Sequence, residues 1–152
     1  MNREKIDRIY GSVRKIDQAY ETWAVGHGLT LCEMWIYYMM LEEGNTMVTQ
    51  KNLSMELGIP KTSINSMIKK QLKLGYMEMQ TNPGNKREKM LSLTEEGRKF
   101  AQELIGPLFQ YEEEIALVLD DQEVEIAVKV QNQFADLLME KIKINTIEKR
   151  EE

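Results

Sequence analysis

Cysteine and histidine, which recur in catalytic and metal sites, are scarce in this 152-residue chain. Cys32 and His27 are its only cysteine and histidine. A structural zinc site needs four ligands of this kind, and an internal disulfide needs two cysteines, so we expect neither. The sequence also lacks a glycine-rich phosphate loop, an HExxH helix and a GxSxG nucleophile motif. We therefore expect no catalytic residue, no metal and no cofactor, and an enzyme is the least favoured class.

The side chains that suggest binding chemistry lie between Lys61 and Lys73. Apolar residues recur there at helical spacing, at Ile64, Met67, Ile68 and Leu72. Small polar and basic residues, with no acidic one, make up the other face: Lys61, Thr62, Ser63, Asn65, Ser66, Lys69, Lys70 and Lys73. Asn, Ser and Thr can bond to base edges, and we expect the last three lysines to contact phosphates. The plainer alternative is a surface helix with solvated lysines.

A second basic group follows in a predicted β-hairpin. Residues 76–80 and 90–94 alternate apolar and polar side chains, and the expected turn at 81–89 contains Asn82-Pro83-Gly84-Asn85. Polar and basic residues cluster at the tip: Asn85, Lys86, Arg87 and Lys89. Such a tip suits contact with a phosphate backbone or a narrow minor groove. An ordinary solvated turn is the alternative.

Helical patterns surround these two features. We expect helices over residues 2–25 and 29–41, from Thr49 to before Gly58, and from Pro60 to Gly75. Thr94 should cap a long fifth helix that Gly106-Pro107 interrupts, and Asp120 should open a final helix to about Ile144. The sequence predicts a mainly α fold with a small β-hairpin wing. The order over residues 49–94 is that of a winged helix-turn-helix.

The distribution of charge agrees with a nucleic-acid-binding module. The whole chain has a net charge of −5, which disfavours contact with phosphates. However, residues 51–90 carry +5, whereas residues 1–50 carry −2 and residues 91–152 carry −8. A basic centre between acidic flanks is typical of a DNA-binding lobe set in a scaffold, although charge alone equally fits a chance cluster of lysines.

These segments together resemble the MarR (multiple antibiotic resistance regulator) family of winged-helix regulators. The similarity lies in Leu29-Thr30, residues 48–53 (VTQKNL), Leu57-Gly58-Ile59, Leu74-Gly75-Tyr76, residues 82–87 (NPGNKR) and residues 91–97 (LSLTEEG). The family's wing usually reads Asp-Pro-x-Asp-Arg-Arg, and its last arginine corresponds to Arg87. The chain departs from the family at Asn85. Family members have an acidic residue at this position, which helps to orient that arginine. It also departs at Gln71, an apolar position in the family, for which Leu72 and Leu74 are expected to compensate.

The resemblance implies a homodimer that reads a near-palindromic operator in double-stranded DNA, most simply as a ligand-responsive repressor. Residues 1–28 and 95–146 would form a helical dimerisation base, residues 29–94 the DNA-binding lobe, and residues 147–152 a charged tail. The expected dimerisation residues are Ile6, Ile9, Tyr10, Val13, Phe134, Leu137 and Leu138. The main alternative is a winged-helix protein-interaction module without direct DNA binding.

Family members bind small, often phenolic, ligands near the junction of base and lobe. An effector pocket is therefore a hypothesis for Trp23, His27, Trp35 and Tyr38, although core and dimer packing is the simpler interpretation. Some members sense oxidants through a first-helix cysteine, a mechanism that does not transfer to Cys32; we expect that thiol to be buried and inert. The sequence shows neither a secretory signal nor a membrane span, so we expect a cytoplasmic protein.

Overall fold

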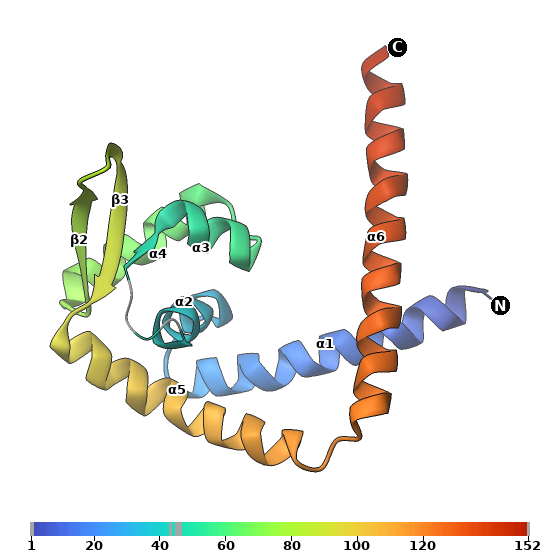
Figure 1. Cartoon of the computed structure of the whole chain (residues 1–152), viewed down its shortest axis with the longest axis horizontal. Helices are drawn as coiled ribbons and strands as arrows, with labels where there is room; N and C mark the ends of the chain where they lie inside the picture. Colours follow the sequence, from blue (N-terminus) through green and yellow to red (C-terminus); the bar gives the residue numbers. More distant parts are fainter. Residues whose placement is uncertain (1, 43, 45–46, 152) are drawn as a thin grey trace. The chain divides into compact units, whose positions relative to one another are not determined.

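The computed structural model describes residues 2–42, 44 and 47–151, with side chains through residue 144. Its helices and hairpin strands follow the predicted order, and one short strand that was not predicted, β1, precedes α3 (Figure 1). The elements are α1 (Asn2–Gly26), α2 (Leu31–Glu42), β1 (Val48–Thr49), α3 (Gln50–Leu57), α4 (Lys61–Leu74), β2 (Met77–Asn82), β3 (Asn85–Leu93), α5 (Glu95–Ala116) and α6 (Asp121–Glu151). The prediction of a mainly helical fold with a small hairpin wing and long terminal helices is confirmed.

The chain forms two compact units. One consists of the residues up to Ser12 together with those from Glu112 onward, and so contains the start of α1, the end of α5 and α6. The other, Val13–Tyr111, contains α2, α3, α4, the whole sheet and the remainder of α1 and α5. All residues expected to bind DNA belong to this second unit.

The helix ends follow the predicted capping chemistry. Thr49 accepts a hydrogen bond from the Asn52 amide at the start of α3, and Gly58 closes that helix at a φ of 63°. Gly75 closes α4 at a φ of 76°. The Thr94 hydroxyl accepts from the Gly97 amide at 3.0 Å and thereby caps α5. These caps fix the lengths of the helices that carry the basic residues.

The sheet has the strand order β1-β3-β2, and both pairs are antiparallel. The predicted nine-residue turn at 81–89 is wrong, because the strands continue until Asn82 pairs with Asn85 around Pro83 and Gly84. The Asn82 side chain accepts from the Gly84 amide at 2.9 Å, which supports this tight turn. Both faces of the hairpin tip are largely exposed, so its strands lack the apolar alternation by which strands are predicted.

Three helix boundaries differ from the prediction. Helix α5 continues through Gly106-Pro107. Pro107 has no amide hydrogen to donate within the helix, but Leu104, Ile105 and Leu108 are buried on either side of it and stabilise this turn. Helix α6 extends beyond Ile144 to Glu151. Helix α2 begins at Leu31, because Thr30 is its cap: the Thr30 hydroxyl accepts from the Glu33 amide, and the Glu33 carboxylate accepts from the Thr30 amide.

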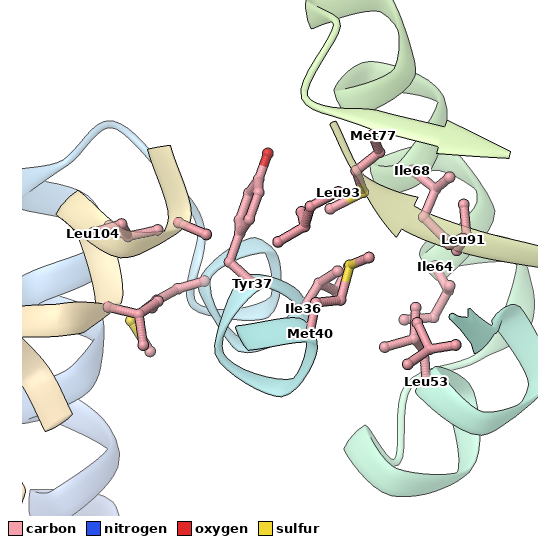
Figure 2. Close-up of a cluster of buried hydrophobic side chains, with 14 of the residues drawn as sticks. Ile36, Tyr37, Met40, Leu53, Ile64, Ile68, Met77, Leu91, Leu93 and Leu104 are labelled. Carbon is pink, nitrogen blue, oxygen red and sulfur yellow. The ribbon is translucent and has the colours of Figure 1, made fainter. Parts of the chain in front are cut away.

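The hydrophobic core of the Val13–Tyr111 unit lies around α2. Ile36 and Met40 contribute to it from α2, and the apolar faces of α3, α4 and the sheet supply its other side (Figure 2). Leu53, Ile64, Ile68 and Leu91 are completely buried there. Burial of such side chains stabilises a fold by roughly 1.5–3 kcal/mol each. This packing holds the inner face of α4 in place and leaves its polar face outside. No helix in the described ranges is both long and apolar enough to cross a membrane.

Candidate nucleic-acid interface

Helix α4 has the two faces that its sequence indicates. Ile64 and Ile68 are buried and Met67 is half-buried, whereas the residues proposed to read DNA lie at the surface. Lys61, Thr62, Ser63, Ser66, Lys69, Lys70 and Lys73 are exposed, and Asn65 is half-exposed. The exposed face therefore offers hydroxyl, amide and ammonium groups without an acidic side chain among them.

The beginning of α4 and the hairpin together line one hollow of about 460 Å³. Helix α4 contributes Lys61 and Asn65, α3 contributes Gln50 and Lys51, and the hairpin contributes Met79, Asn85, Arg87, Glu88 and Lys89. Four of these side chains are cationic and one is acidic. The fold thus brings the two predicted basic groups, separated in sequence, to the same concave surface.

The wing tip is ordered by asparagine side chains. The Asn85 side-chain oxygen accepts from the Arg87 amide at 3.2 Å. The Asn82 side chain uses its oxygen for the Gly84 amide and its nitrogen to donate to Glu88 at 2.9 Å. At the position where the MarR wing has an acid, Asn85 therefore fixes the backbone that carries the exposed Arg87 side chain.

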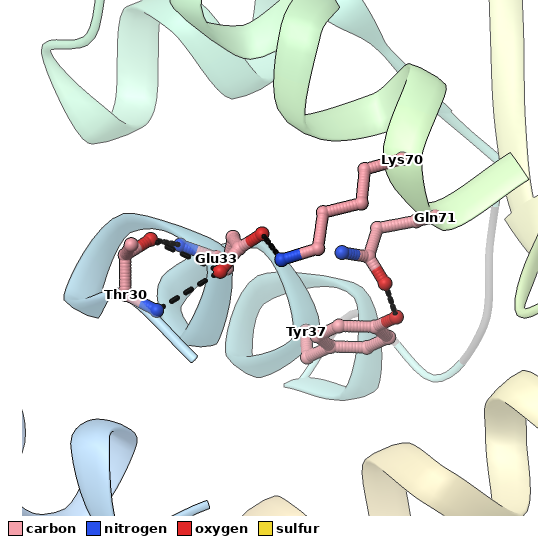
Figure 3. Close-up of polar contacts among 5 residues, drawn as sticks. All are labelled: Thr30, Glu33, Tyr37, Lys70 and Gln71. Carbon is pink, nitrogen blue, oxygen red and sulfur yellow. Dashed lines mark hydrogen bonds and ion pairs between the residues drawn. The ribbon is translucent and has the colours of Figure 1, made fainter. Parts of the chain in front are cut away.

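Lys70 differs from the other lysines of α4 because it is paired. Its ammonium donates to the Glu33 carboxylate of α2 at 2.7 Å (Figure 3). The Glu33 side chain is only 4% exposed, and it also accepts from the amide and hydroxyl of Thr30. Burial alone would raise the pKa of the Glu33 carboxyl, but the hydrogen bonds from Lys70 and Thr30 and the charge of Lys70 outweigh it and hold that pKa below its ordinary value.

The next residue of α4, Gln71, is also bound to α2. Tyr37 donates its hydroxyl to the Gln71 side-chain oxygen at 2.5 Å, and both residues are fully buried. Burial, followed by the charges of Tyr76 and Glu33, raises the pKa of the Tyr37 phenol, which therefore stays a neutral donor. The expected compensation by Leu72 and Leu74 is wrong: Gln71 itself occupies the buried position, while Leu72 is half-buried and Leu74 is 53% exposed.

Of the aromatic residues of the proposed effector pocket, Trp35 and Tyr38 line one hollow together. This hollow has a volume of about 400 Å³ and is also lined by other residues of α2 and α3, including Glu42 and Glu56. Trp23 and His27 instead lie against each other, with ring centroids 4.4 Å apart. The Trp23 indole donates to the Leu104 carbonyl at 2.9 Å, so its polar edge is already used within the fold.

The remaining predicted residues have the following surroundings. Ile6, Ile9, Val13 and Phe134 are half-buried, and Tyr10, Leu137 and Leu138 are exposed. Cys32 is half-buried on α2, whereas the sequence-based expectation was a buried thiol. Among the described residues, no group of three or more His, Cys, Asp or Glu side chains is arranged to hold a metal ion.

Five residues at the interface are not among those predicted to bind DNA: Gln50, Lys51, Met79 and Glu88, which line the hollow, and Glu33, which pairs with Lys70. Gln50 and Lys51 line the hollow from the first turn of α3, and their place beside the hairpin becomes evident only once β1 pairs with β3. Glu33, the partner of Lys70, lies three residues after Thr30. That Thr-x-x-Glu spacing is the usual capping-box signature and was available in the sequence.

Solved structures share this arrangement over nearly the whole chain. A MarR family regulator from Neisseria meningitidis matches with a TM-score of 0.78 and 20% identity, over 93% of this chain and 98% of its own. The transcription regulator MarR from Oenococcus oeni matches with a TM-score of 0.69 and 17% identity, over 86% of this chain and 98% of its own. This chain has the MarR fold.

The MarR fold is thus evident from structure and not from overall sequence similarity. No protein-family model and no curated protein sequence matches the chain. A structure of reduced AbfR bound to DNA also matches this chain, with a TM-score of 0.63 and 19% identity, over 90% of this chain and 92% of its own.

Proposed function

We propose that this protein is a sequence-specific DNA-binding transcriptional regulator that acts as a homodimer, most simply as a repressor. The observation that carries the proposal is the cationic hollow between α4 and the hairpin, lined by Lys51, Lys61, Arg87 and Lys89. Helix α4 would enter the major groove, where Asn65 and its neighbouring hydroxyl groups meet base edges. Arg87 would reach the flanking minor groove, and Lys69 and Lys73 would contact phosphates.

Two structures of proteins with a similar fold support DNA binding as the function. Reduced AbfR has been solved bound to DNA. A MepR mutant from S. aureus, which matches this chain with a TM-score of 0.54, has been solved bound to an oligodeoxyribonucleotide. A regulator of this kind acts where the chromosome is, so we place the protein in the cytoplasm.

The test is titration of duplex DNA at two salt concentrations, with a duplex obtained by selection from random sequences. Wild-type binding should weaken steeply as salt rises, because lysine and arginine contacts release counterions from phosphates. Arg87→Ala and Lys69→Ala should bind more weakly, whereas Lys99→Ala, an exposed lysine on α5, should bind as the wild type does. Equal affinity of all four proteins would show that α4 and the wing are not the DNA surface.

A different class of partner remains as the competing proposal. A winged-helix protein-interaction module would use the same basic face to dock an acidic protein. In that case no salt-dependent DNA binding would be found, and the selection from random DNA would yield no preferred sequence. The four cations of the hollow suit both partners, so the DNA titration decides between them.

The homodimer is supported by exposed apolar side chains in the unit that contains α6. Leu117 and Val118 are 87% and 81% exposed, and Leu137 and Leu138 are about half-exposed. Large exposed apolar side chains are typical of an interface where they form a patch. A dimer would present two α4 helices about 34 Å apart, which is one turn of DNA.

An effector would act by changing that spacing. We propose a small aromatic molecule bound beside Trp35 and Tyr38, because these two rings line one hollow. A ligand that prefers one dimer state shifts the populations towards it. A small-molecule displacement screen on the DNA complex would identify such a compound, and the Trp35→Phe variant should lose the response while Trp23→Phe keeps it.

A further inference from the structure

The lysines of the recognition helix α4 differ in what surrounds them. Lys69 and Lys73 are exposed side chains on that helix. Lys70 is 54% exposed, yet its ammonium lies 2.7 Å from a carboxylate that is almost completely buried. In Figure 3, Lys70 and Gln71 extend from α4 towards Glu33 and Tyr37 of α2. Two consecutive residues of α4 thus bind two residues one turn apart on α2.

A contact of Lys70 with a DNA phosphate would have to break this ion pair. The Glu33 carboxylate would then keep only its bonds from Thr30. Leaving a buried charge without its counter-charge is strongly unfavourable. Because the charge of Lys70 is already neutralised by Glu33, Lys70 should also add little to the counterions that binding releases. Its chemistry therefore fits attachment of α4 to α2 better than attraction of DNA.

The second contact indicates the same role. Gln71 is 1% exposed, and its side-chain nitrogen has no hydrogen-bond partner among the described residues. A buried unpaired donor lowers stability, so an apolar residue would serve a purely packing role better. The bond from Tyr37 to the Gln71 oxygen sets the rotation of α4 against α2, which apolar packing specifies less strictly.

We propose that Glu33–Lys70 and Tyr37–Gln71 form a positioning clamp that fixes the orientation of α4 and so determines how well the protein discriminates between DNA sequences. The clamp residues act through the base-reading side chains and do not touch DNA. This inference rests on the proposed DNA-binding function. It replaces the sequence-based expectation that Lys70 contacts a phosphate.

The first test compares Lys70→Met with Lys69→Met on the selected duplex and on a scrambled duplex of the same composition. Each variant removes one charge and keeps an unbranched apolar stem. Lys69→Met should weaken binding to both duplexes alike and reduce the slope of log K against log salt by about 0.9, as loss of one phosphate contact does. Lys70→Met should leave the slope unchanged and reduce the preference for the selected duplex roughly tenfold, as misorientation of a base contact would.

The second test requires no DNA. Lys70→Met should lower the Tm by several degrees because it leaves Glu33 unpaired, and the double variant Glu33→Gln/Lys70→Met should recover most of that loss. Likewise, Tyr37→Phe/Gln71→Leu should be at least as stable as the wild type. It removes the unpaired Gln71 nitrogen, and it also removes the Tyr37 hydroxyl that would otherwise lose its acceptor. That folded, stable double variant should still lose sequence preference, which separates positioning from simple stabilisation.

The outcomes separate this inference from the function on which it rests. If the wild type binds DNA but Lys70→Met reduces the salt slope as Lys69→Met does, Lys70 is a phosphate contact and the clamp is overturned while the function stands. The clamp would also be overturned if Tyr37→Phe/Gln71→Leu preferred the selected duplex as strongly as the wild type does. If the wild type binds no DNA, the proposed function fails and the clamp's role in discrimination fails with it.

Discussion

At the scale of single residues, Gly97 shows how closely the wing is joined to α5. A Cβ atom on Gly97 would lie 1.7 Å from the Tyr76 carbonyl oxygen, which is far inside contact distance. Tyr76 also accepts from the Thr94 amide and stacks on Phe100, so its backbone has little room to move. Only glycine permits this close approach. The contact therefore explains why the LSLTEEG segment ends in glycine at position 97.

We therefore expect Gly97→Ala to destabilise the protein by roughly 1–3 kcal/mol or more, as overpacking of a rigid site does. The free energy of unfolding, measured by urea denaturation, checks this. Gly26→Ala is the matched control, since a Cβ there meets nothing within 4 Å, and it should change stability little. Equal stability of the two variants would contradict the close contact.

The Glu33 carboxyl predicts a specific dependence of stability on pH. Its pKa in the folded protein lies below the ordinary value of 4.5, so the unfolded chain binds this proton more readily. The stabilisation is fully present above pH 4.5 and is lost as the pH falls through the lower folded pKa. The Tm of the wild type should therefore fall more steeply below this pH than that of Glu33→Gln. A Tm difference that stays constant with pH would refute the pairing.

At the scale of the elements, the wing depends on its asparagines. Asn85→Ala removes the acceptor of the Arg87 amide, so Arg87 should be held less firmly and DNA binding should weaken, by less than in Arg87→Ala. Asn85→Asp keeps the acceptor and should retain wild-type affinity within a few-fold. Affinities from fluorescence anisotropy of a labelled duplex test this order. Full affinity of Asn85→Ala would show that the bond has no part in binding.

Elements were predictable from sequence where periodicity and caps agree. The caps at Thr49, Gly58 and Gly75 follow from local hydrogen bonding, and α4 shows both of its faces in its residue types. The hairpin tip was mispredicted because its strands are exposed on both sides, and β1 is too short to show any period. The Lys70 pairing depends on α2 lying against α4, which residue spacing within α4 does not reveal.

At the scale of the molecule, the sequence indicates the MarR fold, whereas assembly remains a prediction. We expect a homodimer, twice the 17.8 kDa of the chain, held by the apolar residues of the unit that contains α6. The double variant Leu137→Glu/Leu138→Glu places charges on this surface and should shift the protein to monomer in sedimentation equilibrium. Met55→Glu, at an exposed apolar residue of α3, should remain a dimer. A dimeric double variant would place the interface elsewhere.

We propose that α4 and the wing together form the surface that binds DNA. Hydrogen exchange of the backbone amides, measured with and without the selected duplex, tests it most directly. If α4 and the wing bind DNA, exchange should become slower in residues 61–67 and 83–89 and stay unchanged in residues 103–111 of α5. Unchanged exchange in residues 61–67 and 83–89 would show that α4 and the wing do not bind DNA, whether or not the duplex protects other parts of the chain.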